Sequence, residues 1–228
     1  MREAERDGLV VLLAVASGSA DGWSYFGLAH AFVANMTGNT VMLGIAVFHL
    51  HGDVIHPLVA LIGYLAGTVV ATLVARKIPE SAVWARPVSW ALFLEAVLLI
   101  AAEAGWVALG HAPSEKAGLA LLAVVALAIG MQSGAMVQLR VPGVVTTYIT
   151  GTWTTLTNGL TLLATRQPRI ERHKKSIEER FALQAAVLGA YLLAAILTGW
   201  TFRHAEAVVG AIPAAAVLLV AGYGALRA

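Results

Sequence analysis

The sequence predicts an all-α polytopic membrane protein made of two inverted repeats, each with three crossings and one broken or re-entrant Thr-Gly segment. Three observations lead to this fold class. Of the 228 residues, 59% are apolar and only 12% are charged, whereas about 25% of the residues of a soluble domain are charged. Apolar segments of spanning length follow one another along the whole chain. Polar motifs around a glycine interrupt two of them, and lysine and arginine gather in particular loops.

Eight apolar segments can be recognised in order, and a spanning helix needs about 20 residues. They cover 8–28, 32–50, 54–75, 87–110, 117–139, 144–165, 181–202 and 206–226. The second is short and contains several amide and hydroxyl side chains, and the sixth is rich in threonine. Because unsatisfied polar groups in lipid cost several kcal/mol, we expect both to be broken rather than to cross as straight helices.

The two interrupted segments carry related Thr-Gly motifs and supply most of the candidate solute-binding residues. The first set is Asn35, Thr37, Gly38, Asn39 and Thr40, and the second is Thr150, Gly151, Thr152, Thr154 and Asn158. If helices begin after the two glycines, their free N–H groups point into the membrane and favour an anionic or strongly polar solute. The alternative is that these side chains only join helices by hydrogen bonds. We expect the two motifs to face each other across one site.

An internal duplication relates the two halves, 1–113 and 114–228, which together form a single membrane domain. Matching positions occur in the same order in each half. The matched pairs are Gly18–Gly22 with Gly130–Gly134, Thr37–Gly38 with Thr150–Gly151, Gly63 with Gly189, Thr72 with Thr198, and Ala96–Leu99 with Ala216–Leu219.

The distribution of lysine and arginine predicts the topology. If all eight segments cross, ten of the 15 basic residues share the side of the N-terminus. If the two Thr-Gly segments enter and leave on one face, thirteen do, and only Lys116 and Arg203 lie opposite. The positive-inside rule favours the second arrangement, with both termini and a connection at 166–180 in the cytoplasm. The two halves then have inverted topology, as in many secondary transporters.

Two acidic residues are expected within spans, where an ionisable group is a functional candidate. Asp21 is a candidate for solute binding and for proton or cation coupling, or else a cap on the broken segment. Glu95 is a second candidate coupling residue or a structural partner of another polar side chain. Gln132 and Ser133 are plausible additions to the solute site, and Tyr148 and Trp153 are candidate walls.

Several function classes find no support in the sequence. The chain has no cysteine, so disulfides and thiolate metal sites are excluded. His49, His51 and His56 cluster at the predicted outer face, and we expect no metal site there. No nucleophile elbow, Walker lysine motif or zinc-protease motif is present, so we expect neither an enzyme nor a cofactor. The net charge of +2 gives no reason to expect a nucleic-acid partner.

The run from Gly18 to Gly22, with Asp21 in it, followed by Phe32 to Thr40 with its Asn-Met-Thr-Gly-Asn stretch, resembles the YoaK-like family of uncharacterised bacterial membrane proteins. The likeness extends over essentially the whole chain in length and segment pattern. It implies a multi-pass protein of the bacterial inner membrane with an embedded polar motif, and it lends no activity.

The residues themselves therefore suggest the function. We expect a small transporter or channel for a polar or anionic solute, with proton or cation coupling as one form of it. The alternative is a non-transporting assembly or sensing module of the membrane. Close glycine pairs indicate helix packing within the chain, with a homodimer as their second interpretation.

Overall fold

The computed structural model is all-helical in the residues that it describes, which are 1–48, 54–76, 78–79, 82–139, 149–164 and 174–228. The helices are α1 (Glu3–Trp23), η1 (Ser24–Ala29), α2 (Met36–Phe48), α3 (Ile55–Val74), α4 (Arg86–Ala108), α5 (Glu115–Leu139), α6 (Ile149–Ala164), α8 (Lys174–His204), η2 (Glu206–Val208) and α9 (Ala211–Arg227). The segment η1 is a π-helical continuation of α1, and it ends at His30, whose φ of 53° is left-handed.

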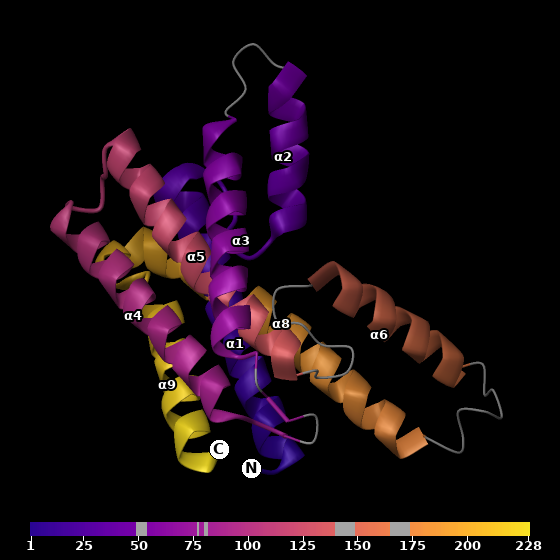
Figure 1. Ribbon diagram of the computed structural model, residues 1–228. Coiled ribbons are helices and arrows are strands. Elements are labelled where there is room, and N and C mark those ends of the chain that lie inside the picture. The colour runs from indigo at the N-terminus through magenta and orange to yellow at the C-terminus, as the bar shows by residue number, and fades with distance from the viewer. Residues whose placement is uncertain (49–53, 77, 80–81, 140–148, 165–173) are drawn as a thin grey trace.

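In the described residues, the long helices α1, α3, α4, α5, α8 and α9 form the body of the molecule. Both chain termini lie at the same end (Figure 1). The most extensive contacts join α3 to α5, α1 to α8 and α4 to α9. Glycines make the first two contacts close, because a Cβ at Gly130 would overlap the carbonyl oxygen of Tyr64 and one at Gly18 would overlap that of Tyr191. The sequence predicted close helix packing at these small residues, and the packing is within the chain.

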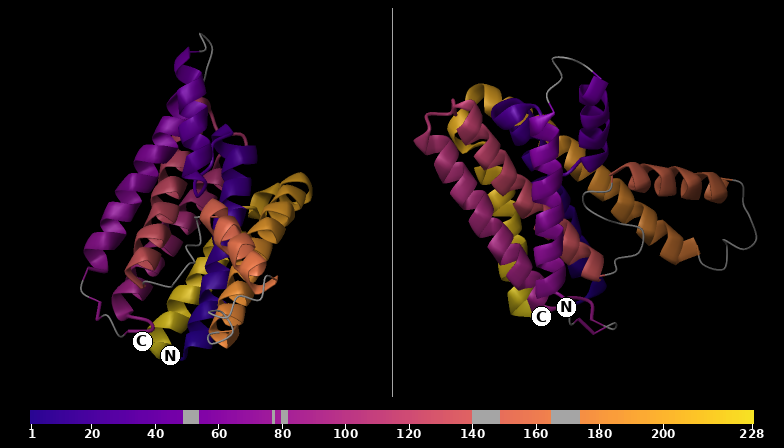
Figure 2. Two further views of the ribbon diagram at one scale, coloured as in Figure 1. Left: turned by 90° about the vertical axis from the view of Figure 1, so that its right-hand side faces the viewer. Right: turned by 45° about the horizontal axis from the view of Figure 1, so that its top comes forward.

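The two short helices lie outside this body, and each rests on one long helix (Figure 1, Figure 2). Helix α2 packs on α3, and α6 packs on α8. The 13 residues of α2 rise about 20 Å, which is less than the hydrocarbon thickness of about 30 Å. The described part of the second apolar segment, which ends at Phe48, therefore contains no helix long enough to cross alone. For the sixth segment, residues 144–148 lie outside the described residues.

The outer surface of the long helices is apolar. Large apolar side chains such as Leu65 on α3 and Leu193 on α8 are about two-thirds exposed. In the described residues, six helices are long and apolar enough to cross a membrane, and α2 is a shorter apolar helix. A soluble protein rarely exposes such contiguous apolar area, so these surfaces fit a lipid environment.

Two expected boundaries differ from the structure. Helix α2 begins at Met36, so Gly38 lies in its first turn and does not mark the break. Gly151 lies within α6, whose described residues start at Ile149. The expected connection at 166–180 is partly helical, because α8 already begins at Lys174. The first residues of α8 are polar, so the hydropathy of the sequence did not indicate that this helix begins before the apolar segment at 181–202.

Candidate functional site

Asp21 is buried inside the molecule and holds a non-helical turn in place. We call residues Ala31–Asn35 the capped turn. One Asp21 oxygen, Oδ1, accepts hydrogen bonds from the backbone N–H groups of Val33 and Ala34, both at 2.7 Å, and a longer one from Asn35 at 3.4 Å. The other oxygen, Oδ2, accepts a bond from the Tyr191 hydroxyl of α8. A single carboxylate thus joins α1, the capped turn and α8.

Two asparagines complete the capped turn and start α2. The Asn35 side-chain oxygen accepts a bond from the Gly38 N–H at 3.2 Å, which satisfies one of the free donors of the first helical turn. Buried Asn39 reaches back to Phe32, accepting from its N–H at 3.0 Å and donating to its carbonyl oxygen at 2.5 Å. Side chains thus satisfy the N–H groups of Phe32 to Asn35 and the Phe32 carbonyl oxygen, and irregular backbone inside a membrane requires such partners.

The threonines of the first motif contribute less than expected. The Thr40 hydroxyl donates to the Met36 carbonyl oxygen at 2.8 Å, one turn earlier in its own helix. Thr37 is exposed beside it. A Cβ at Gly38 would lie 3.1 Å from the Phe32 ring and from the Asn35 amide nitrogen. Gly38 therefore allows the capped turn to pack closely on the first turn of α2.

A cavity of about 550 Å³ opens beside this carboxylate, and we call it the Asp21 cavity. It lies between α1, η1, the capped turn and α8. Its lining residues are Asp21, Gly22, Tyr25, Phe26, Phe32, Asn35, Tyr191, Ala195, Ile196 and Gly199. The Tyr25 and Phe32 rings stack with their centroids 5.3 Å apart. The volume lies in the range of about 300–1,000 Å³ that is usual for small-molecule sites.

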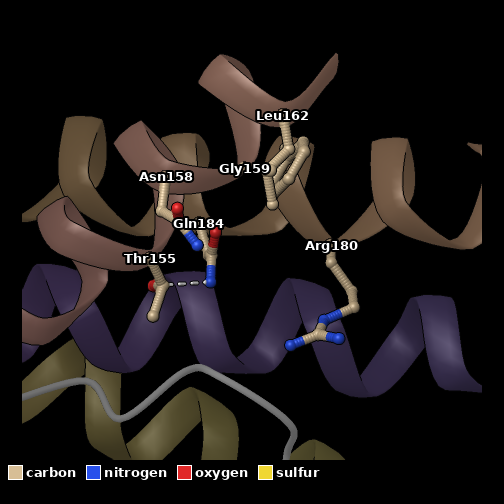
Figure 3. Close-up of a pocket in the computed structure, with 7 residues that line it drawn as sticks. Thr155, Asn158, Gly159, Leu162, Arg180 and Gln184 are labelled. Atoms are coloured by element: carbon tan, nitrogen blue, oxygen red, sulfur yellow. Dashed lines mark hydrogen bonds between the residues drawn. The ribbon is translucent and has the colours of Figure 1, made fainter. Parts of the chain in front are cut away.

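The second Thr-Gly motif lies on the hairpin of α6 and α8. Thr154 donates to the Thr150 carbonyl oxygen at 3.0 Å, so its hydroxyl is also used within its own helix. Thr152 is buried, whereas Thr150 is exposed. The side-chain nitrogen of Gln184 donates to the Thr155 hydroxyl at 3.0 Å and ties the two helices together (Figure 3).

A smaller cavity of about 260 Å³ lies between these two helices. Thr155, Asn158, Gly159, Leu162, Arg180, Phe181 and Gln184 line it, and Figure 3 shows the Asn158 amide and the Arg180 guanidinium at different ends of the group. A Cβ at Gly159 would overlap the Phe181 ring, so this glycine sets how closely the hairpin packs. Asn158 is thus the one residue of the second predicted set that lines a described cavity.

The two Thr-Gly motifs lie at similar positions along the long axis of α8. Helices α6 and α8 are antiparallel, with Gly159 beside Phe181 and Thr155 bonded to Gln184. Continuing this register by the helical rise places Ile149 at about the height of Tyr191. The first turns of α2 and α6 also lie close together in all the ribbon views (Figure 1, Figure 2). Each of the two cavities is nevertheless lined by one motif only, so a single shared site remains a prediction.

Gln132 and Ser133 lie apart from the Asp21 cavity, buried in α5. The Gln132 amide nitrogen donates to the Leu13 carbonyl oxygen at 3.1 Å and to the Ser17 hydroxyl at 2.7 Å. These bonds fasten α5 to α1, which is the structural role that a polar side chain has between membrane helices.

Glu95 is fully buried in α4, and neither carboxyl oxygen has a hydrogen-bond partner among the described residues. Gly105 of α4 lies beside Leu121 of the antiparallel α5. Glu95 is ten residues before Gly105 in α4, and Met131 is ten residues after Leu121 in α5. In this antiparallel pair Glu95 is therefore at about the same depth as Met131 and Gln132. Burying an unpaired carboxylate is very costly, so a neutral, proton-carrying group fits this position.

Tyr191 and the aromatic lining were not identified from the sequence. A buried aspartate in a membrane span needs hydrogen-bond donors, so the tyrosines of the other spans could have been considered as its partners. Among the described residues no group of three or more histidine, aspartate or glutamate side chains could hold a metal ion. His49, His51 and Tyr148 lie outside the described residues, and Trp153 is exposed on α6.

Comparison with known proteins places the chain among transmembrane proteins. Residues 9–223 match the family described as "Protein of unknown function (DUF1275)". The chain is 31% identical over 195 residues to the "UPF0700 transmembrane protein YoaK" of Bacillus subtilis (strain 168), covering 85% of this chain and 83% of that protein. No solved structure matches. The resemblance expected from the Asp21 and Asn35–Asn39 motifs is confirmed.

Proposed function

We propose that this chain, which belongs to the DUF1275 family of proteins of unknown function, is a small transporter or channel that carries a polar solute through the Asp21 cavity. The observation that carries the proposal is a buried carboxylate that both lines a cavity and holds broken backbone beside it. Tyr191 lies midway along the candidate span Glu178–His204, so the α8 wall of the cavity starts at the middle of an apolar helix. Solute sites of secondary transporters are built from such discontinuous helices.

An inverted repeat is part of the proposal, and the helix contacts support it. Helix α1 would correspond to α5, α2 to α6, α3 to α8 and α4 to α9. The α1–α8 contact then corresponds to the α5–α3 contact, and both pairs are parallel. Gly18 meets Tyr191 and Gly22 meets Thr198, while Gly130 meets Tyr64 and Gly134 meets Thr68 and Ala71.

These contacts pair Tyr64 with Tyr191, one position away from the match that the sequence suggested. They also pair Ala71 with Thr198, in place of Thr72. In apolar helices many neighbouring residues are similar, so the sequence alone does not distinguish one match of the two halves from another that is shifted by one residue. Helix packing distinguishes the two matches, because only the residues on one face of α3 and α8 contact the glycines of α5 and α1.

The proposed orientation has both termini in the cytoplasm of a bacterium, with the protein in the inner membrane. The termini share one end of the molecule (Figure 1). Leu28 lies beside Gly118 at the start of α5, so η1 ends at the opposite end, near Lys116. This agrees with thirteen basic residues on one side and two on the other.

Coupling to protons would use the two buried acids. Protonation of Asp21 would weaken its bonds to the capped turn, because hydrogen bonds to an ionised acceptor are roughly twice as strong as neutral ones. Glu95, without a hydrogen-bond partner in the described part of the chain, would exchange a proton without breaking any bond described here.

A non-transporting membrane module is the second candidate, and one observation favours it. Each Asp21 oxygen already has a donor, and the hydroxyls of Thr40 and Thr154 bond within their own helices. A purely structural cluster would have these properties. The Asp21 cavity distinguishes the two functions, because an assembly module does not require one. An enzyme is not proposed, since no nucleophile, base and oxyanion donor converge in the described residues.

Transport by the purified protein in proteoliposomes tests the proposal. Uptake of a panel of small solutes (a zwitterionic amino acid, an organic cation and a carboxylate) would be measured with and without an inward proton gradient. The Asp21→Asn variant keeps an acceptor for the capped turn and should fold but lose proton-dependent uptake, whereas Asp21→Leu should lose both folding and uptake. Uptake equal to that of protein-free liposomes for every solute would refute transport.

A further inference from the structure

Among the described residues, the wall of the Asp21 cavity carries one acidic side chain and no basic one. Among its lining residues there is no lysine, arginine or histidine. The acidic side chain is Asp21, and the other polar side chains of this wall are the Asn35 amide and the hydroxyls of Tyr25 and Tyr191. An anionic solute would therefore find no positive partner among the described lining residues, which is unfavourable inside a low-dielectric region.

Four backbone donors at the capped turn and the start of α2 are also occupied. The sequence suggested that free N–H groups at the start of a broken helix would attract a negative solute. In the structure the N–H groups of Val33, Ala34 and Asn35 already donate to Asp21, and that of Gly38 donates to the Asn35 side chain. The anion bound at this turn is the side chain of the protein itself.

Aromatic rings form much of the remaining wall. Tyr25 stacks on Phe32 with centroids 5.3 Å apart and meets Phe26 edge-on at 5.7 Å. Tyr191 adds a fourth ring from α8. Aromatic faces carry a negative quadrupole that repels anions and attracts cations, above all weakly hydrated ammonium groups.

We propose that the solute of the Asp21 cavity is a small organic cation, a protonated or quaternary amine with an apolar part. The ammonium group would lie against the aromatic rings near Asp21, and the apolar part would lie along Ala195, Ile196 and Gly199 of α8. This inference rests on the proposed transport function and narrows its solute class. The cavity volume of about 550 Å³ suits a solute of this size.

Three probes of similar shape and different charge test the solute class. Phenethylammonium is the cation, 2-phenylethanol the neutral analogue and 3-phenylpropanoate the anion. Their binding to the full-length protein in lipid nanodiscs would be measured by isothermal titration calorimetry. Phenethylammonium should bind at least about tenfold more tightly than either of the other probes, because only a cation gains from the carboxylate and the rings.

Matched variants locate the binding. Phe26 on η1 lines the cavity and is 49% exposed, while Phe93 on α4 is 43% exposed and lies elsewhere. Phe26→Leu should weaken phenethylammonium about three- to tenfold, and Phe93→Leu should leave it unchanged. Neither residue holds the capped turn, so loss of folding does not complicate the comparison.

The possible outcomes separate this inference from the proposed function. Tighter binding of 3-phenylpropanoate, equal affinity for the three probes, no binding of phenethylammonium, or equal effects of the two leucine variants would each overturn the organic-cation assignment. The transport function would then stand or fall on the proteoliposome uptake panel alone. Selective cation binding that Phe26→Leu weakens and Phe93→Leu does not would support the assignment.

Discussion

Removing the Asp21 carboxylate should be among the most destabilising single changes in the protein. In Asp21→Ala the N–H groups of Val33 and Ala34, each bonded at 2.7 Å, lose their acceptor in a buried site. An unsatisfied buried donor costs about 1–3 kcal/mol, so two of them cost about 2–6 kcal/mol. The weaker bond from Asn35 and the lost bond from Tyr191 would add to this value.

The isosteric variant should be milder. In Asp21→Asn one side-chain oxygen can still accept from the capped turn, but the bonds lose their ionic part, so we expect a cost of about 1–2 kcal/mol. Tyr191→Phe removes one bond to the carboxylate and should cost about 1–3 kcal/mol. Because both changes act on one hydrogen bond, the double variant should be less destabilised than the sum by about 1 kcal/mol.

Unfolding of the purified protein by increasing SDS in mixed micelles would measure these differences. Asp7→Ala is the matched control, since Asp7 lies on the same helix but pairs with Arg6 at a partly exposed site, where an ion pair contributes about 0–1 kcal/mol. If Asp21→Ala cost no more than Asp7→Ala, the carboxylate would not be holding the capped turn and the reasoning would be refuted.

Three further changes test other parts of the structure in the same unfolding assay. A Cβ at Gly67 would overlap the Leu127 carbonyl oxygen, so Gly67→Ala should lower the free energy of unfolding by about 1–3 kcal/mol or more. Gly189→Ala is the control, because nothing lies within 4 Å of the added carbon, and it should leave the stability unchanged. Equal losses of stability in the two variants would contradict the α3–α5 packing. Glu95→Leu should stabilise the protein by about 1–3 kcal/mol by removing an unpartnered buried carboxyl, and a loss of stability would show that Glu95 has a partner. Asn39→Ala should cost about 2–4 kcal/mol through two lost backbone bonds, and a cost below about 0.5 kcal/mol would argue against them.

Much of the fold could be predicted from the positions of polar residues, because an unsatisfied polar group in lipid is costly and therefore marks where a span is broken or buried. An apolar segment interrupted by Asn35 and Asn39 cannot remain a lipid-facing straight helix, and α2 is short and preceded by irregular backbone. The same reasoning identified Asp21 as a residue with a special role. Hydropathy together with the charge distribution predicted six crossings, and six helices in the described residues are long and apolar enough to cross.

The details of the site depended on tertiary packing and could not be predicted. Tyr191 is 170 residues from Asp21, and nothing local in the sequence shows that the two helices touch. The threonine hydroxyls were expected to face a solute, but in a helix the carbonyl oxygen four residues earlier is always within reach. Thr40 and Thr154 use that acceptor.

The most direct test of the account is whether water reaches the Asp21 cavity inside the membrane. The chain has no cysteine, so single cysteines can be introduced without further changes. Ala195 lines the cavity, whereas Leu193 on the same helix is 66% exposed and does not. In proteoliposomes, Ala195→Cys should react with a membrane-impermeant thiol reagent and Leu193→Cys, facing lipid, should not. If Ala195→Cys were as unreactive as Leu193→Cys, the cavity would be closed to water and the proposed solute site would be contradicted.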